Sequence, residues 1–148
     1  MNAALRSKLS QAYANTGLES VVLSATPHKR VSLLYDGAVR HVRLARIAVE
    51  KKDIPAKARH TGKAMDIVSG LRSVLNHEHG EQLTSQLDAL YEFILRHLLE
   101  ASKDNSADKY QTVLEILETL KDGWDNMPEE YRRMDDAQLE RLRAQAGQ

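Results

Sequence analysis

The chain has 148 residues, with 21 Lys plus Arg against 21 Asp plus Glu and no cysteine. The formal net charge of zero argues against a nucleic-acid-binding protein, which normally carries a basic excess. The lack of cysteine excludes disulfides, thiol catalysis and cysteine-ligated zinc. Because there is no membrane-span-length apolar run and no signal-peptide core at the N-terminus, we expect a soluble, cytoplasmic protein of domain size.

Apolar spacing predicts an all-α chain with four long helices and a shorter helical segment at each end. Residues 1–25 are expected to form a mobile arm with a short helix, since a few isolated turns are marginal in water. Thr26 and Pro27 are typical of a helix start, as are Asp53 and Pro55. The four long helices are expected over residues 26–52, 53–76, 81–102 and 107–126.

Links of only a few residues between these helices indicate antiparallel neighbours. We therefore predict an antiparallel up-and-down four-helix bundle over residues 26–127. Residues 128–148 are expected to form a polar helical extension, capped by Asp135 or Asp136.

The third predicted helix carries more apolar surface than one buried face requires. Its apolar residues cover roughly 240° of the helical wheel, whereas a core-facing stripe needs about 100°. They are Leu83, Leu87, Leu90, Tyr91, Phe93, Ile94, Leu95, Leu98 and Leu99. This excess predicts a second apolar face, reserved for a partner.

Signals for catalysis or metal binding are weak. His77, Glu78 and His79 have the wrong spacing for ligands on one helix face, so neither a metal nor another cofactor is expected. No glycine-rich phosphate loop appears either, and the chain is predicted not to be an enzyme.

One segment suggests an alternative function. His60 to Ala64 is similar to the motif of histidine phosphotransfer domains, although Ala64 stands where that motif has glycine. Phosphotransfer through His60 is therefore the competing hypothesis, against the interpretation of this segment as a solvated helix face.

Several further helical positions are interpreted from their residue type. Tyr35 and His41 are expected to pack in the bundle with their polar tips satisfied. Gly37, Gly62 and Gly70, inside the predicted helices, leave two interpretations open: close helix packing, or a shallow notch for the backbone of a partner.

Several short motifs occur in order along the chain. They are Tyr13 in the arm, Thr26-Pro27, Leu34-Tyr35-Asp36-Gly37-Ala38, Lys63-Ala64 followed by Ile67 and Leu71, Leu87 with Leu90-Tyr91, and Trp124 near the end of the fourth helix. Over about residues 13–127 the chain thereby resembles the flagellin export chaperones, the FliS family. The matching positions Leu34, Tyr35, Gly37 and Trp124 are expected to serve as family-motif residues.

The resemblance implies a function without catalysis. Members of this family bind the disordered C-terminal segment of newly made flagellin, keep it from polymerising in the cytosol, and help bring it to the flagellar type III export apparatus. The implied partners are flagellin, the export gate and accessory chaperones, with no nucleic acid and no membrane insertion. The protein itself is expected to be a monomer or a weak homodimer.

Binding of this kind combines recognition of a helix in a groove with folding of the client. The groove is expected between the second and third helices, lined by Met65, Val68, Leu71, Leu75, Leu87, Tyr91, Ile94, Leu95, Leu98 and Leu99. A weaker candidate surface consists of Leu33, Leu44 and Ile47 on the first helix. Leu9 and Tyr13 of the arm are expected to cover the main groove when it is empty.

Overall fold

The computed structural model describes residues 26–76 and 81–146. Its helices are α3 (Pro27–Glu50), α4 (Ile54–Asn76), α5 (Glu81–Asp104), α6 (Ala107–Asp125), α7 (Glu129–Arg132) and α8 (Asp136–Ala146). The predicted all-α fold is confirmed, and the four long helices match the expected ones to within a few residues. The four-residue helix α7 was not predicted.

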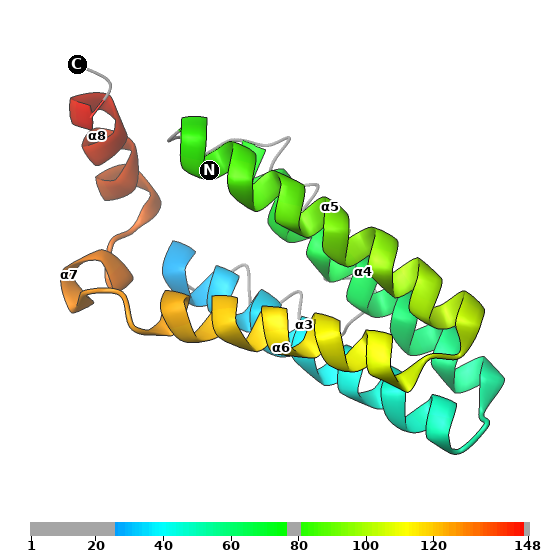
Figure 1. The fold of residues 1–148 in the computed structure, drawn as a ribbon. Helices are drawn as coiled ribbons and strands as arrows, with labels where there is room; N and C mark the ends of the chain where they lie inside the picture. The colour runs from blue at the N-terminus through cyan, green and yellow to red at the C-terminus, as the bar shows by residue number, and fades with distance from the viewer. Residues whose placement is uncertain (1–25, 77–80, 147–148) are drawn as a thin grey trace.

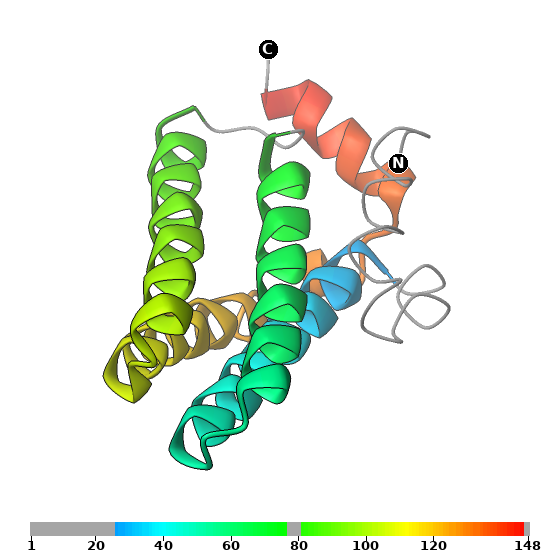
Figure 2. The ribbon, with the colours of Figure 1, turned by 90° about the vertical axis from the view of Figure 1, so that its right-hand side faces the viewer.

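The four long helices form a closed ring. Helix α3 packs against α4 and α6, and α5 packs against the same two helices. Each helix thus has its sequence neighbours beside it, as in the predicted up-and-down bundle. Figure 1 shows α4 and α5 as one layer and α3 and α6 as the other, with the two layers diverging toward the end where α3 begins. Helices α7 and α8 extend from that end (Figures 1 and 2).

Helix starts follow the capping chemistry of the sequence. The hydroxyls of Thr26 and Ser106 each accept a hydrogen bond from the backbone amide three residues later in the chain, at 3.2 Å in both cases. Asp53 does the same for α4 at 3.1 Å. For α8 the cap is Asp135, whose carboxylate accepts from the amide of Gln138 while the Gln138 side chain accepts from the amide of Asp135. This reciprocal pair is a capping box.

Two residues with left-handed backbone conformation make the tight turns of the ring. Lys52 has φ 58° after α3, and Asn105 has φ 50° after α5. The amide of Ser106 then bonds back to the carbonyl of Ala101 at 3.0 Å, which closes the C-terminus of α5. Helix α5 consequently runs two residues beyond its expected end at Ser102.

The core draws on all four long helices. Leu34 and Val42 of α3, Ile67 of α4, Ile94 of α5 and Leu117 of α6 are fully buried. Polar atoms in this core are paired: the hydroxyl of Tyr35 on α3 lies 2.5 Å from that of Tyr91 on α5, and the hydroxyl of Tyr110 on α6 lies 2.7 Å from that of Thr61 on α4. These pairs join helices across the ring, because Tyr35 and Tyr91 lie on helices that are not ring neighbours.

Candidate binding surface

One row of residues on α5 faces α4 along the seam between the two helices. Asp88, Glu92, Leu95 and Leu99 follow each other at intervals of three or four residues, so they share one side of the helix. The guanidinium of Arg72 on α4 binds the two acidic members: its Nε donates to Asp88 Oδ1 at 2.6 Å, and its Nη2 lies 3.9 Å from Glu92 Oε2. The hydrogen bond from Arg72 lowers the pKa of Asp88. This end of the seam is closed by charged groups.

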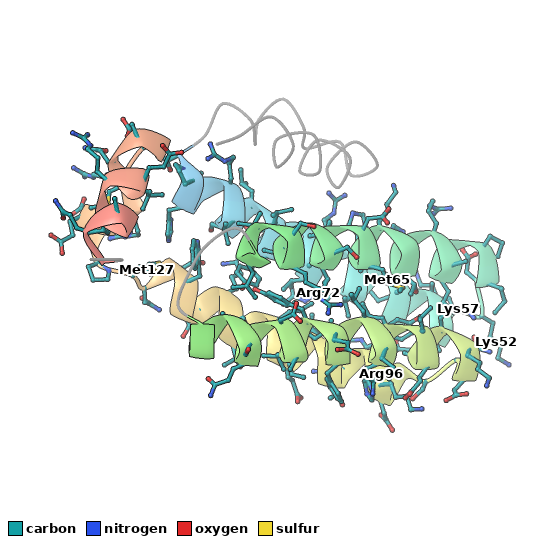
Figure 3. The ribbon with its side chains drawn as sticks, turned by 90° about the horizontal axis from the view of Figure 1, so that it is seen from above. Lys52, Lys57, Met65, Arg72, Arg96 and Met127 are labelled. Carbon is teal, nitrogen blue, oxygen red and sulfur yellow. The ribbon has the colours of Figure 1, made fainter. Side chains whose placement is uncertain are left out.

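The other end of the seam is closed by Lys57 of α4. Its side chain is buried, and its ammonium donates to the carbonyl of Ser102 and to Oδ1 of Asn105, both at 2.7 Å. Lys57 therefore satisfies a carbonyl at the C-terminus of α5, where a positive charge also complements the helix dipole. Figure 3 shows Lys57 and Arg72 at the two ends of the seam with Met65 between them.

Between these two polar contacts the seam is apolar. Met65 and Leu95 are half-buried, and Leu99 keeps 58% of its surface exposed. We call these three residues the α4–α5 strip. These apolar side chains give an amphipathic partner helix or an extended apolar segment a place to pack.

Gly62 on α4 and Leu99 on α5 both lie toward the Lys57 end of the seam. Lys57 bonds to Ser102, and both Gly62 and Leu99 lie about one turn from this contact, so they are near the same level of the antiparallel pair. A Cβ placed on Gly62 would meet no atom within 4 Å. The close-packing interpretation of Gly62 is therefore wrong. The alternative, a shallow notch for the backbone of a partner, stays a prediction.

The structure separates the predicted groove residues into two groups. Five belong to the bundle core and present almost no surface: Val68, Leu71, Tyr91, Ile94 and Leu98. Met65, Leu75, Leu87 and Leu95 are partly buried, and Leu99 is exposed. Of the family-motif residues, Leu34, Tyr35 and Gly37 are buried and Trp124 is partly buried. Leu9, Tyr13 and the segment His77 to His79 lie outside the described residues.

Other exposed apolar side chains lie away from the strip. Phe93 of α5 is 41% exposed and stacks on His97 with ring centroids 5.0 Å apart. It belongs to the predicted apolar arc, but sequence reasoning did not assign it to a groove. On α3, Ile47 is 36% exposed, and Leu33 and Leu44 are partly buried.

The histidine of the alternative hypothesis does not lie on a simple solvated face. His60 is partly buried, and its Nδ1 lies 3.0 Å from Nδ1 of His41, which is itself buried. Burial, followed by the charges of His60, Lys63 and Arg40, lowers the pKa of His41 to about 4. Burial also lowers the pKa of His60, with further contributions from the neighbouring cations. His41 and Tyr35 thus pack in the bundle with partnered polar atoms, as expected.

The described part of the chain has neither a metal-ligand cluster nor a membrane-spanning helix. There, no three His, Cys, Asp or Glu side chains come together as a metal cluster. Across residues 26–76 and 81–146, no helix is both long enough and apolar enough to cross a bilayer.

Comparison with known proteins decides the family. The model of the family described as Flagellar protein FliS matches residues 9–131. The chain belongs to the FliS family. It is 34% identical over 129 residues to the flagellar secretion chaperone FliS of Vibrio cholerae, covering 87% of this chain and 95% of that protein. It is 36% identical over 120 residues to the flagellar secretion chaperone FliSB of Pseudomonas aeruginosa, covering 81% and 95%.

A third relative extends the comparison to another genus. The chain is 35% identical over 115 residues to the flagellar secretion chaperone FliS of Salmonella typhimurium, covering 77% of this chain and 85% of that protein. Secretion chaperone is a non-enzymatic role, which agrees with the prediction that the chain is not an enzyme. Membership of this family gives no support to phosphotransfer through His60.

Proposed function

We propose that this protein is a flagellar export chaperone that binds the disordered C-terminal segment of flagellin. It holds the segment unpolymerised in the cytosol and assists its delivery to the flagellar type III export apparatus. The family supports the chaperone role. The observation that carries the binding site is Leu99, a large apolar residue of α5 that keeps 58% of its surface exposed.

The α4–α5 strip suits a client that folds as it binds. Leu95 and Leu99 of α5 offer apolar contacts about one turn apart, and Met65 of α4 adds a third. The contacts of Arg72 and Lys57 hold α4 and α5 together at the two ends of the strip. A rigid surface lowers the ordering cost on the chaperone side, so that most of the entropy loss falls on the client. Such coupled binding gives moderate affinity over a large contact area, which allows release at the export apparatus.

The five predicted groove residues that lie in the core contribute differently. Tyr91, Ile94 and Leu98 hold the inner side of α5 against the bundle, so they position Leu95 and Leu99 on the outer side. We therefore assign direct client contact to the α4–α5 strip and a supporting role to the core residues beneath it.

A titration tests the proposal. The full-length protein is mixed with a labelled C-terminal peptide of flagellin from the same organism, and binding is followed by fluorescence anisotropy. A peptide from the N-terminal segment of the same flagellin is the control. We expect saturable binding of the C-terminal peptide alone. Equal binding of the two peptides would show that the surface does not select the proposed client, and no binding of either would reject the client assignment.

Light scattering separates client binding from self-association. If the strip is free for a client, the protein remains monomeric and forms a complex of defined mass with the peptide. A stable dimer that the peptide does not dissociate, and that Leu99→Gln does dissociate, would make the strip a homodimer interface instead.

A further inference from the structure

A polar cleft of about 620 Å³ lies at the end of the bundle where α3 begins and α6 ends. Its lining comes from the start of α3, the end of α6 and the residues at and after α7, not from α4 or α5. Figure 1 shows α3 and α6 as the layer opposite α4 and α5. Four cationic side chains line it against two carboxylates: Lys29, Lys121, Arg132 and Arg133 against Asp36 and Asp125. The chain as a whole is formally neutral, so this cleft is a local concentration of positive charge.

A rigid pair of rings lies beside this cleft. The imidazole of His28, which lines the cleft, stacks on the indole of Trp124 with ring centroids 5.1 Å apart and planes 7° from parallel. Nε2 of His28 bonds to the carbonyl of Trp124 at 2.8 Å, and Nε1 of Trp124 donates to the carbonyl of His28 at 3.0 Å. These reciprocal bonds join the start of α3 to the end of α6, so the cleft is preorganised.

Both carboxylates of the cleft are already occupied. The ammonium of Lys121 lies 2.5 Å from Asp125 and 3.3 Å from Asp36. Ser32 also donates its hydroxyl to Asp125 at 2.7 Å. Lys121 therefore offsets one of the two negative charges, and the other three cations exceed the one that remains.

Lys29, Arg132 and Arg133 have few or only weak ion-pair partners. Within residues 26–76 and 81–146, the ammonium of Lys29 and the guanidinium of Arg132 form no ion pair. Arg133 pairs with Glu129 one turn away on the surface, a type of contact worth only a few tenths of a kcal/mol. The first turn of α3 carries no acidic residue, so its helix dipole adds to the positive potential.

Part of this wall lies beyond the segment that the family model matches. The FliS family model ends at residue 131, so it stops just before Arg132 and Arg133. The cleft has the volume of a site for a small group of side chains. Nucleic acid instead requires a basic stripe free of acids, and Asp36 and Asp125 interrupt any such stripe.

We propose that this cleft docks an acidic peptide segment of a partner protein, whose carboxylates contact Lys29, Arg132 and Arg133. This inference goes beyond the proposed client binding, because the two surfaces are built from different helices. The chaperone can then hold its client on the α4–α5 strip while a second protein contacts the α3–α6 side. The partner is recognised by its carboxylate groups.

Trp124 is the single tryptophan of the chain and lies next to the cleft, so its fluorescence reports occupancy. The full-length protein is titrated at low salt with an octapeptide of alternating Glu and Ser, and the emission of Trp124 is followed. We expect a saturable change. The double variant Arg132→Glu/Arg133→Glu should raise the Kd by roughly tenfold or more, and Lys29→Glu should raise it severalfold.

The controls decide between occupants. Arg141→Glu makes the same single charge reversal as Lys29→Glu, but on exposed α8, and should alter the Kd by less than about twofold. A Lys-Ser octapeptide should not bind. The proposal is overturned if the acidic peptide gives no saturable signal, or if Arg141→Glu weakens it as much as the double variant. Tighter binding of inorganic phosphate or of a single-stranded oligonucleotide would also reject it in favour of an anion or nucleic-acid site.

Discussion

Replacing Leu99 by Gln tests the binding surface with little effect on the fold. Leu99 is 58% exposed, and complete burial of a leucine side chain is worth about 1.5–3 kcal/mol. Burial of its exposed part by the client therefore contributes about 1–2 kcal/mol, which predicts a Kd raised about 5- to 30-fold. The stability of the free protein should change by less than about 0.5 kcal/mol, since an exposed helical position is altered.

The assay is anisotropy of a labelled flagellin C-terminal peptide, together with urea unfolding of each variant. Leu142→Gln on α8 is the matched control, because Leu142 is also exposed, at 37%, but far from the strip. The neighbouring Leu98→Ala should instead lower the free energy of unfolding by about 2–5 kcal/mol, because Leu98 is fully buried. A Kd for Leu99→Gln within twofold of the unaltered protein, with Ile47→Gln weakening binding instead, would move the site to α3.

Four further outcomes follow from the structure. Gly62→Ala should raise the free energy of unfolding by about 0.5–1 kcal/mol, since the added methyl meets open space and helix propensity improves; a loss of stability in urea would contradict this. Tyr91→Phe should lower the free energy of unfolding by about 1–3 kcal/mol, because it leaves the hydroxyl of Tyr35 buried and unpaired. The double variant Tyr35→Phe/Tyr91→Phe should lower it by less than the sum of the two single changes. Lys57→Met should destabilise by at least about 1.5 kcal/mol, measured in urea, because a charge-assisted bond to a carbonyl of α5 is lost; an unchanged unfolding midpoint would show that this contact is unimportant. The pKa of His41 is about 4 in the folded protein and about 6.5 in the unfolded chain, so the unfolded chain binds a proton more readily. The free energy of unfolding should therefore fall as the pH drops from about 6.5 to 4. Denaturation curves of His41→Gln should show a weaker dependence on pH.

Most of the fold could be predicted because its determinants are local. Thr26, Asp53 and Ser106 each cap a helix by accepting a hydrogen bond from the backbone amide three residues later. A short link between two long helices makes them pack antiparallel. The end of α5 was placed two residues early because its termination depends on the left-handed conformation of Asn105, which composition alone does not specify.

The binding surface could be predicted only in part. The excess apolar arc of α5 predicted apolar surface outside the core-facing stripe, and Leu99 and Phe93 are both exposed, although on different sides of the helix. A helical wheel gives the direction of each side chain but not its neighbours. It could not show that Tyr91 is buried or that its hydroxyl pairs with the hydroxyl of Tyr35. Nor could it show that Gly62 faces open space, since that depends on the register between α4 and α5.

The closed order of the ring has a consequence for synthesis on the ribosome. One side of α3 is covered by α6, which is the last of the four long helices to be translated. Until the segment up to Asp125 has emerged from the ribosome, the nascent chain exposes apolar surface along α3 and cannot complete its fold. Prematurely terminated products ending before Ala107 should therefore aggregate or be degraded.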